Sequence, residues 1–262
     1  MDSVETTGPS WRIGCAGVPD GMRRERYFEN LTYVELDNTF HTLPKQKVLK
    51  RWAGPNHTYG VVAWQAITHP PQGGSYPRCN QSFDAETLPQ AGSFKDSAFV
   101  RDAVTRLATS VTASGAETIV FRTDPSWTPS ASNQQRLRTF FTEIATADRF
   151  GSCQRVWQPA GLWELPQAAA LAADVGVLVA CDPLPSDPLG PPMDFFADLA
   201  QRFEGRAYFR LTGLGQSRKL NEYKREVLLA LMLQFQEGWL VFETPTKYHD
   251  ARSVAKEIAG AA

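Results

Sequence analysis

Apolar and polar residues along this chain form a pattern that repeats eight times. Each repeat is a short run of apolar, often β-branched residues, followed by a turn and a longer segment with apolar residues at helical spacing. Alternating units of this kind predict parallel strands joined by helices. Eight units within about 250 residues predict a single closed α/β barrel of the TIM type. The predicted strands are residues 11–16, 33–37, 60–67, 118–123, 155–158, 177–180, 207–211 and 239–242.

The segments between these runs predict the helices of the barrel. Residues 133–148 show the pattern well, because Leu137, Phe140, Phe141 and Ile144 are spaced i, i+3, i+4 and i+7. Gly176 marks the end of another helix, at the position that glycine favours after a helix. The predicted helices are residues 23–30, 45–53, 99–114, 133–148, 166–175, 193–203, 225–236 and 250–258.

One long segment, from Thr68 to Asp96, is an excursion within this single domain of residues 1–262. It is rich in proline and glycine, and Tyr76, Phe83 and Phe94 are spread along it. Because it follows the third strand, and βα loops form the C-terminal face of a barrel, we expect it to cover that face. An open, doubly wound sheet is the alternative fold. A dinucleotide-binding sheet of that kind carries G-x-G-x-x-G after its first strand, and the turn Gly14–Gly21 does not match it.

The composition is that of a globular protein of neutral charge. There are 27 basic and 28 acidic residues, for a net charge of −1, and 42% of the residues are hydrophobic. The neutral charge disfavours bulk nucleic-acid binding, which depends on neutralising phosphates. We expect no membrane partner, because no apolar stretch approaches the ~20 residues that a membrane span needs.

We expect the protein in the cytoplasm with reduced thiols. Residues 1–10 lack the basic start and apolar run of a secretory signal. The four cysteines form no C-x-x-C pair, which disfavours a zinc ribbon or a dithiol redox site. Cys15 and Cys181 lie on apolar strands and are predicted to be inert core thiols.

Candidate functional residues follow from the fold, because active sites of TIM barrels lie at the C-terminal ends of the strands. Those ends carry Glu35, Asp37, Asn38, His41, Gln65, His69, Arg122, Asp124, Trp127, Trp157, Gln158, Asp182, Arg210 and Glu243.

Two carboxylates and two arginines stand out among these residues. Glu35 and Asp37 alternate with apolar residues and are predicted to point to the same side of the second strand. Buried carboxylates need partners, and Arg122 and Arg210 can supply them. The group forms either a pocket for an anionic or phosphorylated ligand or an ion-pair layer that closes the barrel. Chelation of a divalent ion with His41 and His69 is a further alternative that no H-E-x-x-H spacing supports.

The segment from Tyr33 to Pro44, YVELDNTFHTLP, with Arg51-Trp52 after it, resembles the signature of the YecE-like family, domain of unknown function 72. Later segments are similar to that family in order: Ile67-Thr68-His69, the stretch 120–127, Asp182 after an apolar strand, and Tyr208-Phe-Arg-Leu-Thr-Gly213. The resemblance implies a TIM-type barrel with no established reaction. Glu35, Thr39, Phe40, Asp182 and Arg210 match the family pattern directly.

Several positions depart from that pattern. The family's glutamate and arginine on strand five are replaced within Val156-Trp157-Gln158-Pro159. The glutamine of strand four is Arg122, the histidine of strand seven is Thr212, and the first asparagine of strand eight is Glu243. These departures indicate a divergent member whose activity is repurposed or lost.

Two functions of different classes are consistent with these residues. The first is an enzyme for a small anionic or phosphorylated substrate, with Glu35 or Asp182 as general acid or base and with Arg122 and Arg210 clamping the anion. Asp37, Asn38, His41, Asp124, Trp127, Trp157 and Glu243 would line its binding site. The second is a non-catalytic barrel for binding or protein interaction. A barrel endonuclease-like enzyme is a weaker third alternative. No cofactor, metal or oligomeric state is assigned.

Overall fold

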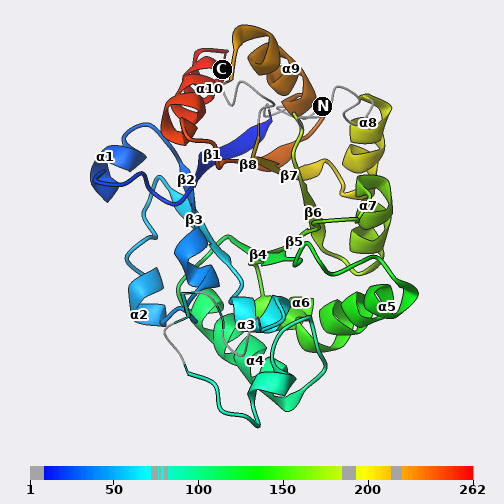
Figure 1. Ribbon diagram of the computed structural model, residues 1–262. Helices are drawn as coiled ribbons and strands as arrows, with labels where there is room; N and C mark the ends of the chain where they lie inside the picture. Colours follow the sequence, from blue (N-terminus) through cyan, green and yellow to red (C-terminus); the bar gives the residue numbers. More distant parts are fainter. Residues whose placement is uncertain are drawn as a thin grey trace, which may run out of the picture. The chain divides into compact units, whose positions relative to one another are not determined.

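The computed structural model describes residues 9–71, 76, 78, 79, 82–184, 193–213 and 220–261. Its eight strands are hydrogen-bonded in chain order as a closed barrel, which confirms the predicted TIM-type fold (Figure 1). The prediction about a leader sequence concerns mainly residues 1–8, which lie outside the described residues. The strands are β1 (Ser10–Ala16), β2 (Tyr33–Leu36), β3 (Thr58–Val62), β4 (Thr118–Arg122), β5 (Gln154–Gln158), β6 (Leu178–Cys181), β7 (Arg206–Leu211) and β8 (Glu237–Phe242).

Helices and short helical turns separate consecutive strands. The α-helices are α1 (Arg24–Phe28), α2 (Gln46–Leu49), α3 (Gln65–Thr68), α4 (Ala98–Thr112), α5 (Ala131–Thr139), α6 (Ala147–Phe150), α7 (Leu165–Asp174), α8 (Met193–Arg202), α9 (Glu222–Met232) and α10 (Lys247–Ala261). The other helical segments are the 3-10 helices η1 (Asp37–Phe40) and η2 (Leu88–Gln90) and the π-helix η3 (Phe140–Ile144).

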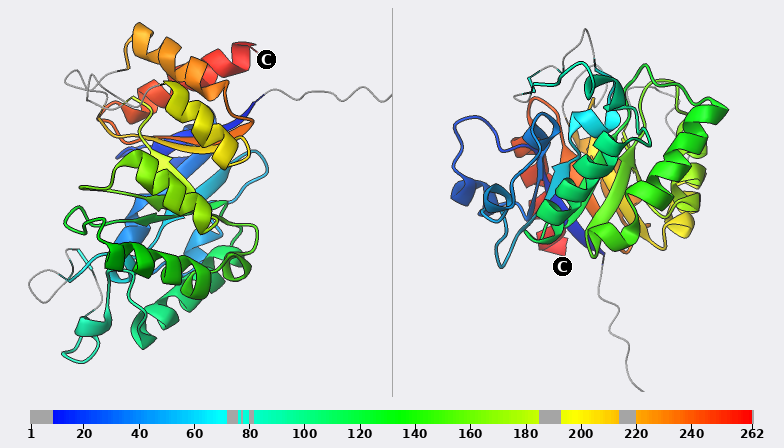
Figure 2. Two further views of the ribbon diagram at one scale, coloured as in Figure 1. Left: turned by 90° about the vertical axis from the view of Figure 1, so that its right-hand side faces the viewer. Right: turned by 90° about the horizontal axis from the view of Figure 1, so that it is seen from below.

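The chain divides into two compact units, residues 35–180 and residues 1–34 with 181–262. In the unit of residues 35–180, β4 pairs in parallel with β3 and with β5, so that Arg122 is in register with Gln158. Helix α4 packs against α2, α3 and α6, and α6 packs on β5 (Figure 2). Strand β4 is buried up to Phe121 and carries the β-branched residues Thr118, Ile119 and Val120, as expected of a strand covered on both faces.

In the unit of residues 1–34 and 181–262, β8 lies between β1 and β7 and is parallel to both. Helix α10 packs on β1 and β8. Cys15 is in register with Phe242, and Arg210 with Val241. The register therefore places the C-terminal ends of these three strands, and the polar residues that follow them, at the same edge.

Gly14 allows a close approach between β1 and the residue at the start of β2. A Cβ atom at Gly14 would lie 1.8 Å from the carbonyl oxygen of Tyr33. The buried Tyr27 hydroxyl joins the same two segments, accepting from the Cys15 N–H at 2.7 Å and donating to the Tyr33 carbonyl at 2.8 Å. A side chain at Gly14 would push these hydrogen-bonded groups apart.

Two predicted elements end earlier than the sequence pattern indicated. The third strand stops at Val62, and residues 65–67, which were predicted as strand, belong to the helical turn α3. Periodicity does not distinguish a buried helical turn from a buried strand. The helix predicted over 133–148 passes into η3 and breaks at Ala145. The buried Arg155 guanidinium donates to the carbonyls of Phe141 and Ala145 at 3.0 and 2.7 Å, so it stabilises the interrupted end.

The cysteines are free thiols, and Cys15 and Cys181 are buried. Burial raises the pKa of the Cys15 thiol to about 12 and raises that of Cys181 further. Both remain protonated at neutral pH, in agreement with their prediction as inert core thiols. Among the described residues, no helix is long and apolar enough to span a membrane. The cytoplasmic location stays a prediction.

We expect Gly14→Ala to lower the free energy of unfolding by about 1–3 kcal/mol or more, because overpacking forces the backbone to move. Urea unfolding measures the change. Gly260→Ala in α10, where no atom lies within 4 Å of the added Cβ, is the control and should shift stability by less than about 1 kcal/mol. Equal effects of the two substitutions would contradict this account of Gly14.

Candidate functional site at the strand ends

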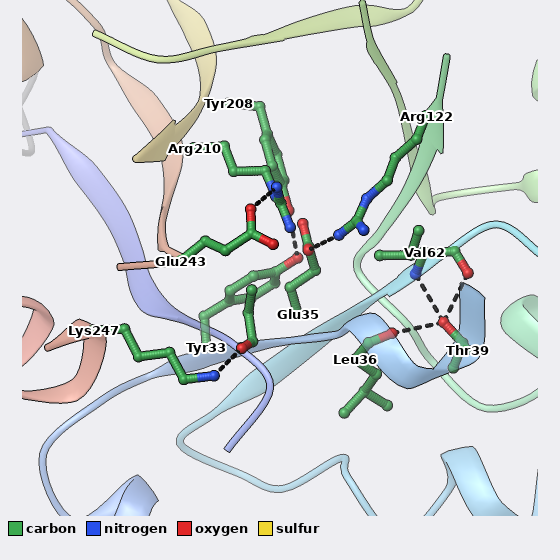
Figure 3. A network of polar contacts seen from close by, with 11 residues as sticks. Tyr33, Glu35, Leu36, Thr39, Val62, Arg122, Tyr208, Arg210, Glu243 and Lys247 are labelled. Atoms are coloured by element: carbon green, nitrogen blue, oxygen red, sulfur yellow. Dashed lines mark hydrogen bonds and ion pairs between the residues drawn. The ribbon is translucent and has the colours of Figure 1, made fainter. Parts of the chain in front are cut away.

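In the unit of residues 35–180, an ion pair joins the C-terminal ends of β2 and β4. Arg122 Nη2 lies 3.0 Å from Glu35 Oε1 (Figure 3). The Glu35 side chain is fully buried, whereas 19% of the Arg122 side chain is exposed. This confirms the predicted pairing of the carboxylate with an arginine from another strand. The result is a cation that is held by a buried anion and is still in contact with solvent.

His69 and Asp124 form a second polar pair in the same unit. His69 follows α3, and Asp124 follows β4. His69 Nε2 is 4.0 Å from Asp124 Oδ2, and His69 Nδ1 is 2.8 Å from the hydroxyl of Thr68. Burial lowers the pKa of His69 to about 4, with a further lowering by Arg122 and an opposing effect of Asp124. The imidazole is therefore neutral at pH 7.

Phe40 joins the two polar pairs. Its ring packs edge-on against the His69 ring, with centroids 4.8 Å apart. The Arg122 guanidinium carbon lies 5.7 Å from the same Phe40 ring, within the range of a cation–π contact. Thr39, beside Phe40, fixes this segment: its hydroxyl accepts from the Val62 N–H at 2.9 Å and lies 2.6 Å from the Leu36 carbonyl (Figure 3). The ion pair and the His69–Asp124 pair thus form one cluster.

Two buried polar side-chain atoms at the C-terminal residues of β4 and β5 lack hydrogen-bond partners within the described part of the chain. They are Arg122 Nε and Gln158 Oε1, which belong to register partners on β4 and β5. An unpaired buried polar atom costs about 1–3 kcal/mol. Such atoms call for an explanation, and a bound water or ligand is the usual one.

The tryptophans predicted to line the site are packed into the protein. Trp157 is fully buried, and its indole N–H donates to Thr123 at 2.6 Å. Trp127 is 9% exposed, and its carbonyl accepts from the Trp163 indole at 2.8 Å. Phe94 of the long segment stacks near Trp127 with ring centroids 5.1 Å apart. The described part of segment 68–96 therefore packs against residues that follow β4; its role as a cover stays a prediction.

In the other unit, Asp182 is hydrogen-bonded to Leu184 and to Thr212, the residue that follows β7. Its carboxylate accepts from the Leu184 N–H at 2.9 Å and from the N–H and hydroxyl of Thr212 at 3.0 Å each. These three hydrogen bonds fix the orientation of the Asp182 carboxylate. This geometry favours a positioning role, and the catalytic role of Asp182 stays a prediction.

Arg210 pairs with Glu243 in the same unit (Figure 3). The Arg210 side chain is 3% exposed and that of Glu243 is 39% exposed. The acid that replaces the asparagine of the resembled family thus neutralises the arginine of the neighbouring strand. Nearby, the hydroxyls of Tyr33 and Tyr208 are 3.4 Å apart.

The prediction that Asp37 continues the alternation of Glu35 is wrong. β2 ends at Leu36, and Asp37, Asn38 and Thr39 form the 3-10 helix η1 with Phe40. Asp37 is half-buried and Asn38 is exposed, so neither extends the buried strand face. His41 follows η1 and packs edge-on against Phe40, with centroids 5.2 Å apart. The binding roles of these residues stay predictions.

Within the described ranges, no three His, Cys, Asp or Glu side chains lie close enough together to hold a metal ion. His69 occurs at a predicted strand end, but no local sequence pattern marks it as the partner of Asp124. Its strand-end position is the signal that could identify it.

The fold and these strand-end clusters define a TIM-type barrel with polar side chains at the carboxyl ends of its strands. The family described as "Protein of unknown function DUF72" matches residues 8–250, so the chain belongs to this family. This confirms the resemblance found in the sequence. No curated protein matches the chain.

Solved structures share the fold at low sequence identity. A DUF72 family protein from Enterococcus faecalis has a TM-score of 0.63 at 11% identity and covers 97% of this chain and 99% of its own. One from Thermotoga maritima has a TM-score of 0.59 at 14% identity, covering 96% and 98%. A xylose isomerase domain protein from Planctomyces limnophilus has a TM-score of 0.55 at 12% identity, covering 96% of each chain.

We expect Arg122→Met to lower the free energy of unfolding by about 3–5 kcal/mol, because it removes the cation paired with a fully buried carboxylate. Chemical denaturation gives the value. The double variant Glu35→Leu/Arg122→Met should regain much of that loss, since it removes the buried charge as well. Arg202→Met, which removes an exposed pair with Asp198, should cost less than about 1 kcal/mol.

The lowered pKa of His69 predicts a pH dependence of stability. Between pH 6.5 and 4 the unfolded chain binds a proton that the folded chain does not, so stability falls as the pH falls through this window. His69→Phe keeps an aromatic ring against Phe40 and should reduce the loss between pH 7.5 and pH 5 by about 2 kcal/mol. Urea unfolding at both pH values tests this. The exposed His249, changed to Gln, should leave the slope unaltered.

Proposed function

We propose that this protein is an enzyme for a small anionic or phosphorylated substrate, which binds at Arg122. The observation that supports this proposal is a guanidinium fixed by a fully buried carboxylate and still exposed to solvent. Arginine presents a planar set of donors that matches carboxylate and phosphate groups. Because the Glu35 contact holds the side chain in place, less conformational entropy is lost when an anion binds.

The roles of the two carboxylates follow from their surroundings. Glu35 has no exposed surface and therefore serves to position Arg122. The Asp182 carboxylate accepts hydrogen bonds from Leu184 and Thr212. Among the charged and titratable side chains of the cluster, Arg122 and His69 keep the most exposed surface, 19% and 17%, and Asp124 keeps 8%. We therefore assign anion binding to Arg122. The predicted contribution of Arg210 to the same anion site requires a variant of its own.

A non-catalytic binding barrel is the second candidate. The observation that favours it is the pairing of strand-end residues in the other unit: Glu243 forms an ion pair with Arg210, and Thr212 donates hydrogen bonds to Asp182. Side chains that are paired with one another in this way are less available to act on a substrate. A ligand bound without turnover would fit this alternative.

Thermal melts with phosphate or sulfate, at ionic strength matched with chloride, test the anion site. Wild type should gain about 2.7 kcal/mol at a hundredfold excess over the dissociation constant. Arg122→Met and the charge-retaining Arg122→Lys should both reduce this gain, because neither keeps the planar donors. Arg202→Met should keep it.

Arg210→Met distinguishes the roles of the two arginines. Loss of the anion effect in this variant would support a shared clamp, whereas a destabilised variant that keeps the effect would make Arg210 structural. A wild type without any anion-specific shift would exclude the proposed anion site.

A further inference from the structure

The geometry points to a hydroxyl-binding pair, His69 and Asp124, so that the substrate is a hydroxylated anion such as a hydroxy acid or a sugar phosphate. This inference rests on the proposed anion site at Arg122 and specifies the substrate that binds there.

The side chains of His69 and Asp124 are separated by slightly more than a hydrogen-bond distance. His69 Nε2 and Asp124 Oδ2 are 4.0 Å apart, which is too long for a direct hydrogen bond. One hydroxyl oxygen at the usual distance of about 2.8 Å from each atom spans this gap. A hydroxyl group can accept from one partner and donate to the other at the same time.

The tautomer of His69 fits that arrangement. A nearby carboxylate favours a proton on the ring nitrogen that faces it, here Nε2. The Thr68 hydroxyl, 2.8 Å from Nδ1, then donates to the other ring nitrogen. The substrate hydroxyl would accept from Nε2–H of His69 and donate to the carboxylate of Asp124. Because the buried imidazole is neutral at pH 7, it offers Asp124 no competing positive charge.

Both residues are held in place. The backbone N–H of His69 donates to the Gln65 carbonyl at 2.8 Å, and the backbone carbonyl of His69 accepts from the Tyr76 hydroxyl at 3.0 Å. Asp124 Oδ1 accepts from the Ser126 N–H at 2.9 Å, which leaves Oδ2 facing the imidazole. Fixed partners bind a hydroxyl with a smaller entropic loss than mobile ones.

The charges of the cluster favour the same ligand. Arg122 is balanced by Glu35, and Asp124 adds a second negative charge while His69 is neutral. A bare, highly charged anion is therefore disfavoured relative to one that also offers hydroxyl groups. Phe40, in contact with both His69 and Arg122, shows that the hydroxyl pair and the anion site are neighbours. We therefore assign both contacts to one small molecule.

Binding of matched ligands tests the inference. The hydroxylated probes are glycolate, gluconate and glycerol 3-phosphate, and the plain probes are acetate and inorganic phosphate. In wild type, at least one hydroxylated probe should bind about tenfold more tightly than its plain counterpart, the gain expected from one charge-assisted hydrogen bond. NMR titration gives the dissociation constants, and the ¹⁵N signals of the His69 ring should move only with that hydroxylated probe.

Asp124→Asn is the test variant, because the amide oxygen can still accept from Ser126. In this variant, the ratio of the dissociation constant of the plain probe to that of the hydroxylated probe should fall close to one. Asp84→Asn is the matched control, since Asp84 also accepts from backbone N–H groups in an exposed turn, and it should keep the wild-type preference. A preference near one in wild type, or an unchanged one in Asp124→Asn, would overturn the inference.

The outcome for the plain anions separates this inference from the proposed function. Plain anions that bind wild type but not Arg122→Met, with no gain from hydroxyl groups, would leave the anion site standing and remove the hydroxyl pair. A hydroxyl preference that survives in Arg122→Met would support the pair and exclude Arg122 as the anion site. Absence of binding by all five probes would reject both.

Discussion

The buried ion pair between Glu35 and Arg122 constrains the strand ends of residues 35–180. A carboxylate with no solvent contact needs a cation at hydrogen-bond distance, and Arg122 supplies it from the end of another strand. That requirement fixes the direction of the Arg122 side chain, and hence its contact with Phe40. Through Phe40 the same constraint reaches His69. The ion pair therefore determines which side chains are neighbours at these strand ends.

The two compact units use strand-end charges differently. In residues 181–262, Asp182 is satisfied by Leu184 and Thr212, and Arg210 by Glu243. In residues 35–180, Arg122 and Gln158 each keep a buried polar atom without a partner among the described residues, and His69 and Asp124 stand just beyond hydrogen-bond distance. Groups that are almost satisfied by the protein itself are the ones that a ligand can complete at a gain.

Much of the fold could be predicted from the sequence, because apolar runs at strand spacing and stripes at helical spacing depend on local residues. The eight strands occur where the runs lie. The predictions failed where tertiary contacts decide the local structure. The Thr39 hydroxyl accepts a hydrogen bond from the Val62 N–H at the end of β3, and residues shortly after Val62 form the helix α3. Asp37 begins η1, so its alternation with Glu35 does not persist.

The site was predictable only to the level of strand ends. The TIM-type fold assigns Glu35, Arg122 and Asp124 to one edge, yet the partner of each depends on side-chain direction and distance. The 4.0 Å between His69 and Asp124 illustrates this point. At about 2.8 Å the two side chains would satisfy each other, and at a much larger distance they would act separately. At the intermediate separation, one hydroxyl oxygen at about 2.8 Å from each atom would satisfy both side chains.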